Sequence, residues 1–329
     1  MSPDSSIAVS RDFRTIQRKS LMFAGALLML SLLVVSVFEP QVLQAPATVA
    51  KTLANRARSV GTDFGLDTVV TLLAMSFFAG LIGGMLGMGG GVLKVAGLLI
   101  IFKLDIYFAR AVSIGAMFFM SLSALPRYMK KDLVIWPLMR HTFLPSVVGI
   151  LVGLLLGNFV GGAVLTHLFG FFVIFLSFAT MGQTFLDPHE ATLDQVFSRD
   201  TKLTPRRRKI LTFIGTMHGF LCGLFGISGG IHTIPAQQVF LDIPIRHAIA
   251  NTLVISVVSA GVGVVLVSVI GVQHGDFTFS QILAAFACVA IGAYGGAQIG
   301  TRLSERTNTH VLRILVEIIG LVAGFALVF

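Results

Sequence analysis

The sequence predicts an all-α polytopic membrane protein made of two inverted-topology repeats. Each repeat has about five apolar segments, including short broken or re-entrant ones, and an N-terminal transmembrane helix precedes them. Composition is the first observation behind this prediction: 12% of the 329 residues are charged and 55% are hydrophobic, whereas a soluble domain carries roughly 25% charged residues. The second is a set of apolar runs of membrane-spanning length. The third is an internal sequence repeat. When the sequence is aligned with itself so that Gly219 matches Gly80, the second half matches the first without a gap.

The apolar runs define the expected spans, since a helix needs about 20 apolar residues to cross the hydrocarbon core. Runs of this kind cover residues 20–38, 67–87, 107–125, 140–157, 162–185, 210–226, 247–271, 281–300 and 309–329. Two shorter pieces, 91–102 and 230–241, follow glycine clusters, and as helices they would reach only about 18 Å. We therefore expect half-helices or returning segments there.

The first run is interpreted separately, because the cations before it and Ala45-Pro46-Ala47 after it resemble a signal peptide. Its apolar stretch is roughly 19 residues long, whereas that of a signal peptide usually has about 7–15. We therefore expect an uncleaved membrane anchor.

The positions of lysine and arginine predict the orientation, because short cytoplasmic loops retain these residues. A cytoplasmic N-terminus places 18 of them inside and five outside, with Lys94 left in the membrane. Lys103 and Arg110 are among the five that this arrangement places outside. The sequence thus predicts a cytoplasmic N-terminus and a periplasmic or external C-terminus.

Duplication divides the chain into four parts. The displacement of Gly219 onto Gly80, called the repeat offset below, places GFLCGLFGISGGIHT on GLIGGMLGMGGGVLK and pairs Ser113 with Thr252. The predicted parts are residues 1–66 (N-terminal cytoplasmic tail, anchor and external linker), 67–185 (repeat one), 186–209 (basic cytoplasmic link) and 210–329 (repeat two). Five segments per unit is an odd number, so the copies would be inverted, as is typical of secondary transporters.

Glycine clusters open the two short segments. They comprise Gly89, Gly90 and Gly91 in the first copy and Ser228, Gly229 and Gly230 in the second. The first N–H groups of a helix lack partners within the helix, and its dipole presents partial positive charge there. Glycine lets a ligand approach such a backbone. The sequence therefore predicts an anion held near the membrane midplane between two helix starts, with close helix packing as the alternative.

These motifs resemble those of the sulfite exporter TauE/SafE family, bacterial membrane permeases built from two related halves. The resemblance rests on GGMLGMGGG at 83–91, GLFGISGG at 223–230 and the small-residue stretches 109–113 and 248–252. It covers about residue 67 to the C-terminus. It implies transport of a sulfur-containing anion, such as sulfite or an organosulfonate, across the bacterial inner membrane. The family's proline after the glycines matches Pro235, whereas the first copy has Ala96 there and carries Lys94, which leaves the substrate open.

Polar residues within the apolar segments are further candidates for substrate binding. Lys94 lies where an unpaired ammonium is costly and usually functional, so we expect it to contact the anion, with snorkelling to the interface as the alternative. His232 lies in the second short segment. Ser113, Asn251 and Thr252 begin the third segments of the two copies, and either donate hydrogen bonds to an oxyanion or bond between helices.

Two residues are candidates for proton coupling. His218 directly precedes Gly219, and Glu317 is the acid that we place within a span. A hydrogen-bonded packing role is the more common one for a membrane histidine such as His218 or His232. For Glu317 we favour an ion pair with Arg313, one turn earlier, with proton coupling as the second interpretation.

The remaining features argue against other classes of function. The cations lie between apolar runs rather than on a solvated face, so no nucleic-acid partner is expected. Cys222 and Cys288 form no framework, and we predict no metal, no cofactor and no catalytic residue. The leading hypothesis is a secondary transporter of a small anion that works by alternating access and is not an enzyme. Its expected partners are the anion and membrane lipid, and formation of a homo-oligomer stays open.

Two alternatives remain beside the transporter. An integral membrane enzyme acting on an anionic lipid head group would use Asp187, His189 and Glu190 at one membrane interface. A non-transporting membrane scaffold would bind a partner through residues 187–209.

Overall fold

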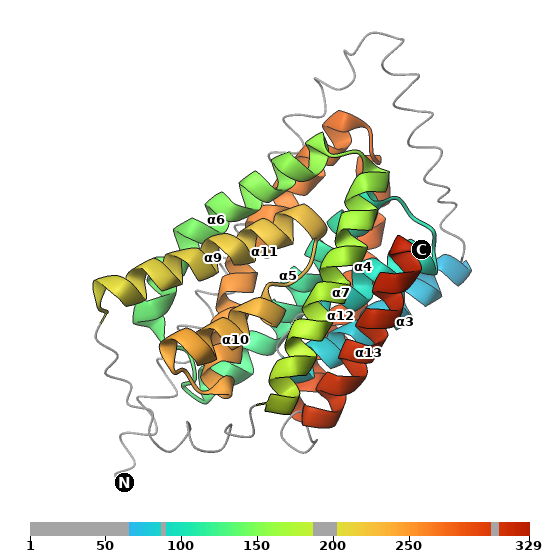
Figure 1. Ribbon diagram of the computed structural model, residues 1–329. Helices are drawn as coiled ribbons and strands as arrows, with labels where there is room; N and C mark the ends of the chain where they lie inside the picture. The colour runs from blue at the N-terminus through green and yellow to red at the C-terminus, as the bar shows by residue number, and fades with distance from the viewer. Residues whose placement is uncertain (1–65, 87–89, 187–202, 304–308) are drawn as a thin grey trace, which may run out of the picture.

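A computed structural model describes residues 66–86, 90–186, 203–303 and 309–329. The predicted anchor at 20–38 and most of the basic link lie outside the described residues. Within them the chain forms α-helices and no strands (Figure 1). The helices are α3 (Leu66–Leu86), α4 (Gly91–Ile100), α5 (Ile106–Lys130), α6 (Trp136–Phe159), α7 (Gly162–Leu186), α9 (Pro205–Phe225), α10 (Gly230–Leu241), α11 (Ile245–His274), α12 (Phe279–Leu303) and α13 (Thr309–Val328).

The helices agree with the predicted spans within a few residues for each long run. Among the described residues, α5, α6, α11 and α12 are long and apolar enough to cross a membrane by length and composition, and shorter apolar helices accompany them. The predicted short segments are the helices α4 and α10. An all-helical, multi-pass membrane fold is thereby confirmed.

Local sequence signals fix several helix ends. The Asp105 side chain accepts a hydrogen bond from the Tyr107 backbone N–H (2.8 Å) and caps the start of α5. Pro205 occupies the first turn of α9, where a missing N–H costs nothing. The same helix ends at Gly226, whose φ of 72° lies in the left-handed region that glycine adopts without strain.

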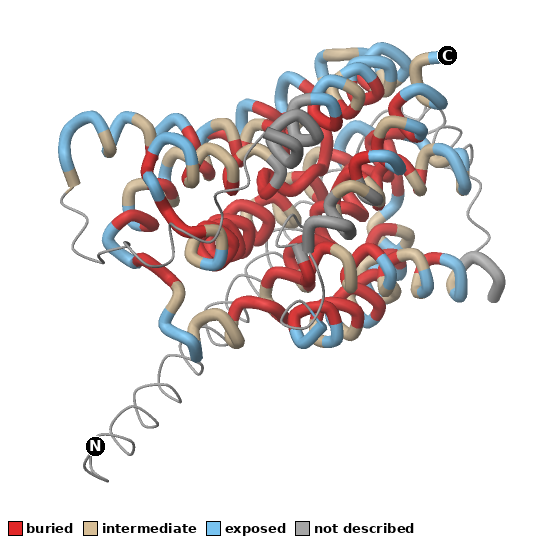
Figure 2. The backbone as a smooth tube through the Cα atoms, turned by 60° about the horizontal axis from the view of Figure 1, so that its bottom comes forward, coloured by how far each residue is buried: buried red, intermediate tan, exposed pale blue. Residues whose placement is uncertain are grey.

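Two helices, α5 and α11, pack against each other in the middle of the molecule. In the most apolar window of α5, 89% of the residues are buried, compared with 39% for α6 and for α12. Figure 2 shows the same distribution, with buried backbone inside and exposed backbone on the outer helices. The outer faces carry large apolar side chains such as Leu144, Leu155, Phe171 and Phe175. Such a surface suits contact with lipid tails, which satisfy apolar groups as well as a protein core does.

Helices of the first half pack against helices of the second half. Helix α6 of the first half packs on α9 of the second, and α3 of the first half packs on α12 of the second (Figure 1). Under the repeat offset, α3 corresponds to α9 and α6 to α12. Two further contacts, α5 with α11 and α7 with α13, each join a helix to its own counterpart.

Small residues allow these helix pairs to approach closely. A Cβ atom on Gly80 would lie 2.6 Å from the Ala293 carbonyl oxygen, and one on Gly153 would overlap the carbonyl of Phe220. Gly292, Gly296 and Gly300 of α12 lie equally close to backbone carbonyls of α3. Gly161 is the exception, since nothing lies within 4 Å of a Cβ placed there.

Candidate functional site

The two glycine breaks lie directly against each other. Helix α4 begins at Gly91 and α10 begins at Gly230. A Cβ atom on Gly91 would lie 2.6 Å from the backbone nitrogen of Ser228 and 2.8 Å from the Cα of Ile227. Such distances are shorter than real Cβ contacts, so only glycine permits this approach. The structure thus brings together the two helix starts that lie far apart in the sequence.

Each helix start is seated on the preceding helix at an equivalent position. A Cβ on Gly90, which has a left-handed φ of 55°, would overlap the Ala79 carbonyl oxygen. A Cβ on Gly229 would overlap the ring of His218. Ala79 and His218 are equivalent under the repeat offset. The two copies therefore seat their helix starts at equivalent positions, although Gly90 is left-handed and Gly229 has a φ of −64°.

Lys94 lies one turn into α4 and is 1% exposed. Its Nζ atom is buried without a hydrogen-bond partner in the part of the chain that the structure describes. Its ammonium interacts electrostatically with Cys222 in the last turn of α9. The alternative of snorkelling to an interface is therefore wrong. Contact of Lys94 with an anion stays a prediction.

The start of α10 is surrounded by hydrogen-bonded polar side chains. The His218 ring lies 3.2 Å from Thr233 Oγ1 through Nδ1, and 3.3 Å from Ser256 Oγ through Nε2. Thr233 Oγ1 also lies 3.3 Å from His232 Nε2, and Ser228 Oγ accepts from the Gly230 N–H (3.3 Å). These contacts join α9, α10 and α11, so both histidines belong to one network beside the helix start.

A second network follows one turn further along α10, around Gln237. Its Oε1 accepts from Asn251 Nδ2 (2.9 Å), and its Nε2 donates to Thr252 Oγ1 (3.2 Å). Asn251 Oδ1 accepts from the Ile135 N–H (2.9 Å). Asn251 and Thr252 are thus engaged within the protein, which is the interhelical alternative. Their donation to an oxyanion stays a prediction.

Arg110, which the charge pattern assigns to the external side, is buried within the protein. It lies in the first turns of α5 and is 1% exposed. Its guanidinium donates to the Gly223 carbonyl oxygen (3.4 Å) and to Asn158 Oδ1, while Nε has no hydrogen-bond partner in the described residues. It interacts electrostatically with Asp276. The signal was available, because Arg110 falls inside the apolar run 107–125.

Ser113 also contacts the end of α9. Its Oγ donates to the Gly226 carbonyl oxygen at 2.7 Å. Arg110 and Ser113, one turn apart on α5, together satisfy two carbonyls at the C-terminus of α9. The hydroxyl hydrogen of Ser113 is therefore already donated within the protein. Its donation to an oxyanion stays a prediction.

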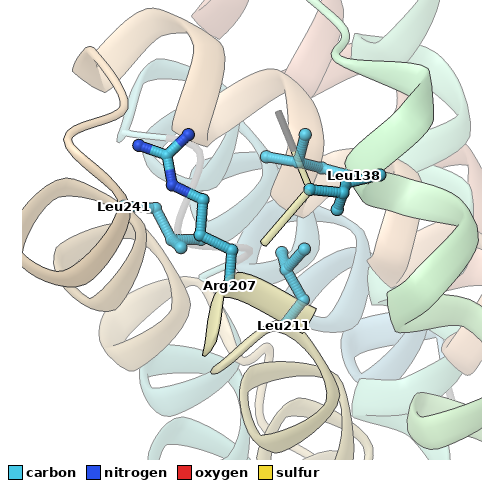
Figure 3. A pocket seen from close by; sticks show the side chains of 5 residues that line it. Leu138, Arg207, Leu211 and Leu241 are labelled. Carbon is cyan, nitrogen blue, oxygen red and sulfur yellow. The ribbon is translucent and has the colours of Figure 1, made fainter. Parts of the chain in front are cut away.

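One hollow among the described residues lies away from this site. It is a shallow surface hollow lined by Leu138, Leu203, Arg207, Leu211 and Leu241. Figure 3 shows the labelled side chains of α6, α9 and α10 around it. Leu241 ends α10, so the hollow lies at the opposite end of that helix from Gly230.

Several predicted residues lie outside the described parts. They are Gly89, the side chain of Arg313, and the loop residues Asp187, His189 and Glu190. Glu317 is described, is 5% exposed and has an interaction partner. The proposed Arg313–Glu317 pair, the enzyme alternative and the scaffold alternative thus stay predictions.

Comparison with known proteins gives a family match. A model of the family described as sulfite exporter TauE/SafE matches residues 72–327. The chain is 27% identical over 277 residues to "Probable membrane transporter protein MamO" of Paramagnetospirillum magneticum, covering 76% of this chain and 43% of that relative. It is 27% identical over 265 residues to the probable membrane transporter protein MJ0441 of Methanocaldococcus jannaschii, covering 78% of this chain and 94% of the relative.

A third relative, the probable membrane transporter protein YunE of Bacillus subtilis, is 25% identical over 265 residues, which cover 76% of this chain and 95% of YunE. The chain spans less than half the length of the MamO proteins that it matches, 43% in each case. No solved structure matches the chain.

Proposed function

Because the chain belongs to the sulfite exporter TauE/SafE family, we propose that it is a secondary transporter that carries a small anion across the membrane by alternating access. The proposed substrate is a sulfur-containing anion such as sulfite or an organosulfonate. The family description names sulfite, and the relatives are named as probable membrane transporters.

The meeting of α4 and α10 at the buried Lys94 is the observation that carries this proposal. Two helix starts offer backbone N–H groups and partial positive charge. Lys94 adds a cationic group that is 1% exposed and has no hydrogen-bond partner in the described residues. An unpaired buried charge of this kind costs several kcal/mol, and an anion would offset that cost. The proposed binding residues are Gly89, Gly90, Gly91, Lys94, Ser113, Ser228, Gly229, Gly230, His232, Asn251 and Thr252.

Alternating access is supported by the way helices of one half pack against helices of the other. The pairs α3–α12 and α6–α9 are equivalent under the repeat offset, as expected for two copies related by a twofold axis. Inverted repeats bind substrate near the midplane at their interface and rock one copy against the other. We propose residues 67–185 and 210–329 as these copies.

The proposed location is the bacterial inner membrane, with a cytoplasmic N-terminus and an external C-terminus. Basic residues at the expected cytoplasmic side support this orientation, including Arg127 and Lys130 in the last turn of α5, Arg140 near the start of α6 and the cations that begin α9. Under this orientation Asp105, Asn158 and Asp276 lie toward the external side.

Proton coupling through His218 or Glu317 remains part of the proposal. Both side chains are buried. His218 lies in α9 beside the site, and Glu317 lies in α13, which packs on α4. The His218 ring contacts hydroxyl groups that can both donate and accept, so this network can pass a proton between partners.

Flux in liposomes tests the proposed function. Purified protein reconstituted in liposomes should move labelled sulfite or a labelled sulfonate, and Lys94→Ala should reduce that flux by at least about 100-fold, because a buried charged partner is removed. Lys103→Ala is the matched control, since Lys103 is exposed in the loop after α4. Flux that is unchanged in Lys94→Ala would overturn the proposed site, and no flux of any anion would overturn the function.

A further inference from the structure

The surface hollow at the end of α10 combines apolar walls with one cationic side chain. Leu138 of α6, Leu211 of α9 and Leu241 of α10 are buried at its walls, and Leu203 is partly exposed. The cation is Arg207 of α9, which Figure 3 shows extending between Leu241 and Leu138. The hollow thus offers a guanidinium beside a leucine-lined surface where three helices meet.

The guanidinium of Arg207 is available to a partner from outside the chain. Its backbone N–H donates to Thr204 Oγ1 (3.3 Å), but within the described residues the guanidinium makes no hydrogen bond or ion pair. Asp242 directly follows Leu241, is exposed, and forms no ion pair with Arg207. Arg207 is partly buried, whereas its neighbour Arg208 is exposed. Arg207 is therefore the cation that turns toward the leucines.

The start of α9 carries a run of positive charge. Arg206, Arg207 and Arg208 lie in its first turn, Lys209 follows them, and that turn contains no acidic residue. The first turn of a helix also presents partial positive charge, so cations placed there are unfavourable unless an anion lies nearby. An anionic partner would offset this repulsion and would pair with Arg207.

The surface of α6 indicates the depth of the hollow in the membrane. Trp136, the one tryptophan of the sequence, begins α6 two residues before Leu138 and is 43% exposed. Tryptophan is enriched at the level of the lipid head groups. One turn later Arg140 begins an exposed row that continues with Leu144 and Val148, which are apolar. The hollow therefore lies where head groups give way to lipid tails.

We infer that this hollow binds an anionic phospholipid, whose phosphate pairs with Arg207 while an acyl chain lies along the leucines. A guanidinium matches the geometry of a phosphate with two parallel hydrogen bonds, and basic pockets at the membrane surface bind anionic head groups. The apolar walls favour a lipid over a soluble phosphate, because a soluble phosphate has no apolar part to bury there. This site is separate from the meeting of α4 and α10, and it does not depend on which anion is transported.

Two lipids with the same acyl chains test the head group. Phosphatidylglycerol is anionic and phosphatidylcholine has no net charge, and native mass spectrometry of the purified full chain in detergent measures the binding of each. We expect phosphatidylglycerol to bind at least about tenfold more tightly. Equal affinities would overturn the inference. Inorganic phosphate at the same concentration should leave the lipid bound, and displacement would assign the hollow to a free anion and overturn the lipid.

Variants locate the lipid at Arg207. Arg207→Gln should weaken phosphatidylglycerol by at least about tenfold, because charge-assisted hydrogen bonds to the phosphate are lost. Arg208→Gln is the matched control, since it removes the same charge from the same turn outside the hollow, and it should cost no more than about fivefold. Equal losses would show diffuse attraction to the whole cation run and would contradict a site at Arg207.

Leu203→Trp tests the acyl chain, because the larger side chain fills a partly exposed wall of the hollow. It should weaken both lipids, and unchanged binding would contradict the proposed acyl contact. Thermal unfolding gives a second measurement: phosphatidylglycerol should raise the Tm of the unmodified chain but not that of Arg207→Gln. If Arg207→Gln is already less stable in lipid-free detergent, the partner of Arg207 lies within the chain and the inference fails, while the proposed transport function stands.

Discussion

The start of α10 is surrounded by hydrogen-bonded side chains, whereas the start of α4 carries a lysine whose amino group has no such partner in the described residues. The repeat offset places Ala79 on His218, Lys94 on Thr233 and Met117 on Ser256. The first copy thus replaces a bonded His–Thr–Ser set by two apolar residues and a lysine. Both starts are nevertheless seated on equivalent positions of the preceding helices, so the two copies keep the placement of the starts while the side chains and the N-cap φ values differ.

This difference suggests a division of labour. The network around α10 holds that helix start in place, because buried polar groups that are fully bonded rigidify their surroundings. The α4 start instead contributes the charge that a substrate would pair with. Each of the following variants separates the two contributions.

The largest effect is expected where the two copies meet, at the contact between Gly91 and Ser228. Gly91→Ala places a Cβ 2.6 Å from the Ser228 nitrogen, a backbone atom that has little freedom to move. We expect a loss of roughly 3 kcal/mol or more in stability, at the upper end for overpacking, and loss of flux. Thermal unfolding in detergent measures the first. Gly161→Ala is the matched control, because a Cβ there meets nothing within 4 Å.

Gly229→Ala tests the second copy. The added methyl group overlaps the His218 ring, and a side chain can yield more than a backbone can. We expect about 1–3 kcal/mol of destabilisation, smaller than for Gly91→Ala. The double variant with His218→Ala should recover part of that loss in the same unfolding assay. Absence of any recovery would contradict the idea that the ring seats this helix start.

Lys94→Thr gives the first copy the residue of the second. Removing a buried cation that lacks a partner should raise stability by about 1–2 kcal/mol, because the desolvation cost of the charge is lost, while flux falls to background. Stability and activity would then change in opposite directions, as at other strained functional sites. A destabilised Lys94→Thr protein would show instead that Lys94 has a structural partner.

Thr233→Val should have the smallest effect. It removes the hydroxyl that lies 3.2 Å from His218 Nδ1 while keeping the shape of the side chain. We expect about 1–2 kcal/mol of destabilisation from the unpaired ring nitrogen and a partial loss of flux, because the proposed proton path through His218 loses one hydroxyl partner. Unchanged flux would exclude Thr233 from that path and leave the α10 network a purely structural role.

Periodic and compositional signals predicted the helices, because apolar runs of membrane length and glycine breaks are local features of the sequence. The approach of Gly91 to Ser228 also followed from the matching positions of the breaks. The sequence did not predict that Arg110 turns inward to the end of α9, since only tertiary packing sets that direction. Nor did it show that Ser113, Asn251 and Thr252 are already bonded within the protein.

The packing of α3, from the first half, on α12, from the second half, sets the order in which the protein assembles. Gly80 of α3 packs on Ala293 of α12, a residue synthesised roughly 200 positions later, which at ~5–20 residues per second takes on the order of 10–40 s. Until α12 is in place, the face of α3 that carries Gly80 is exposed to lipid. The first half therefore completes its packing only after most of the second half has entered the membrane.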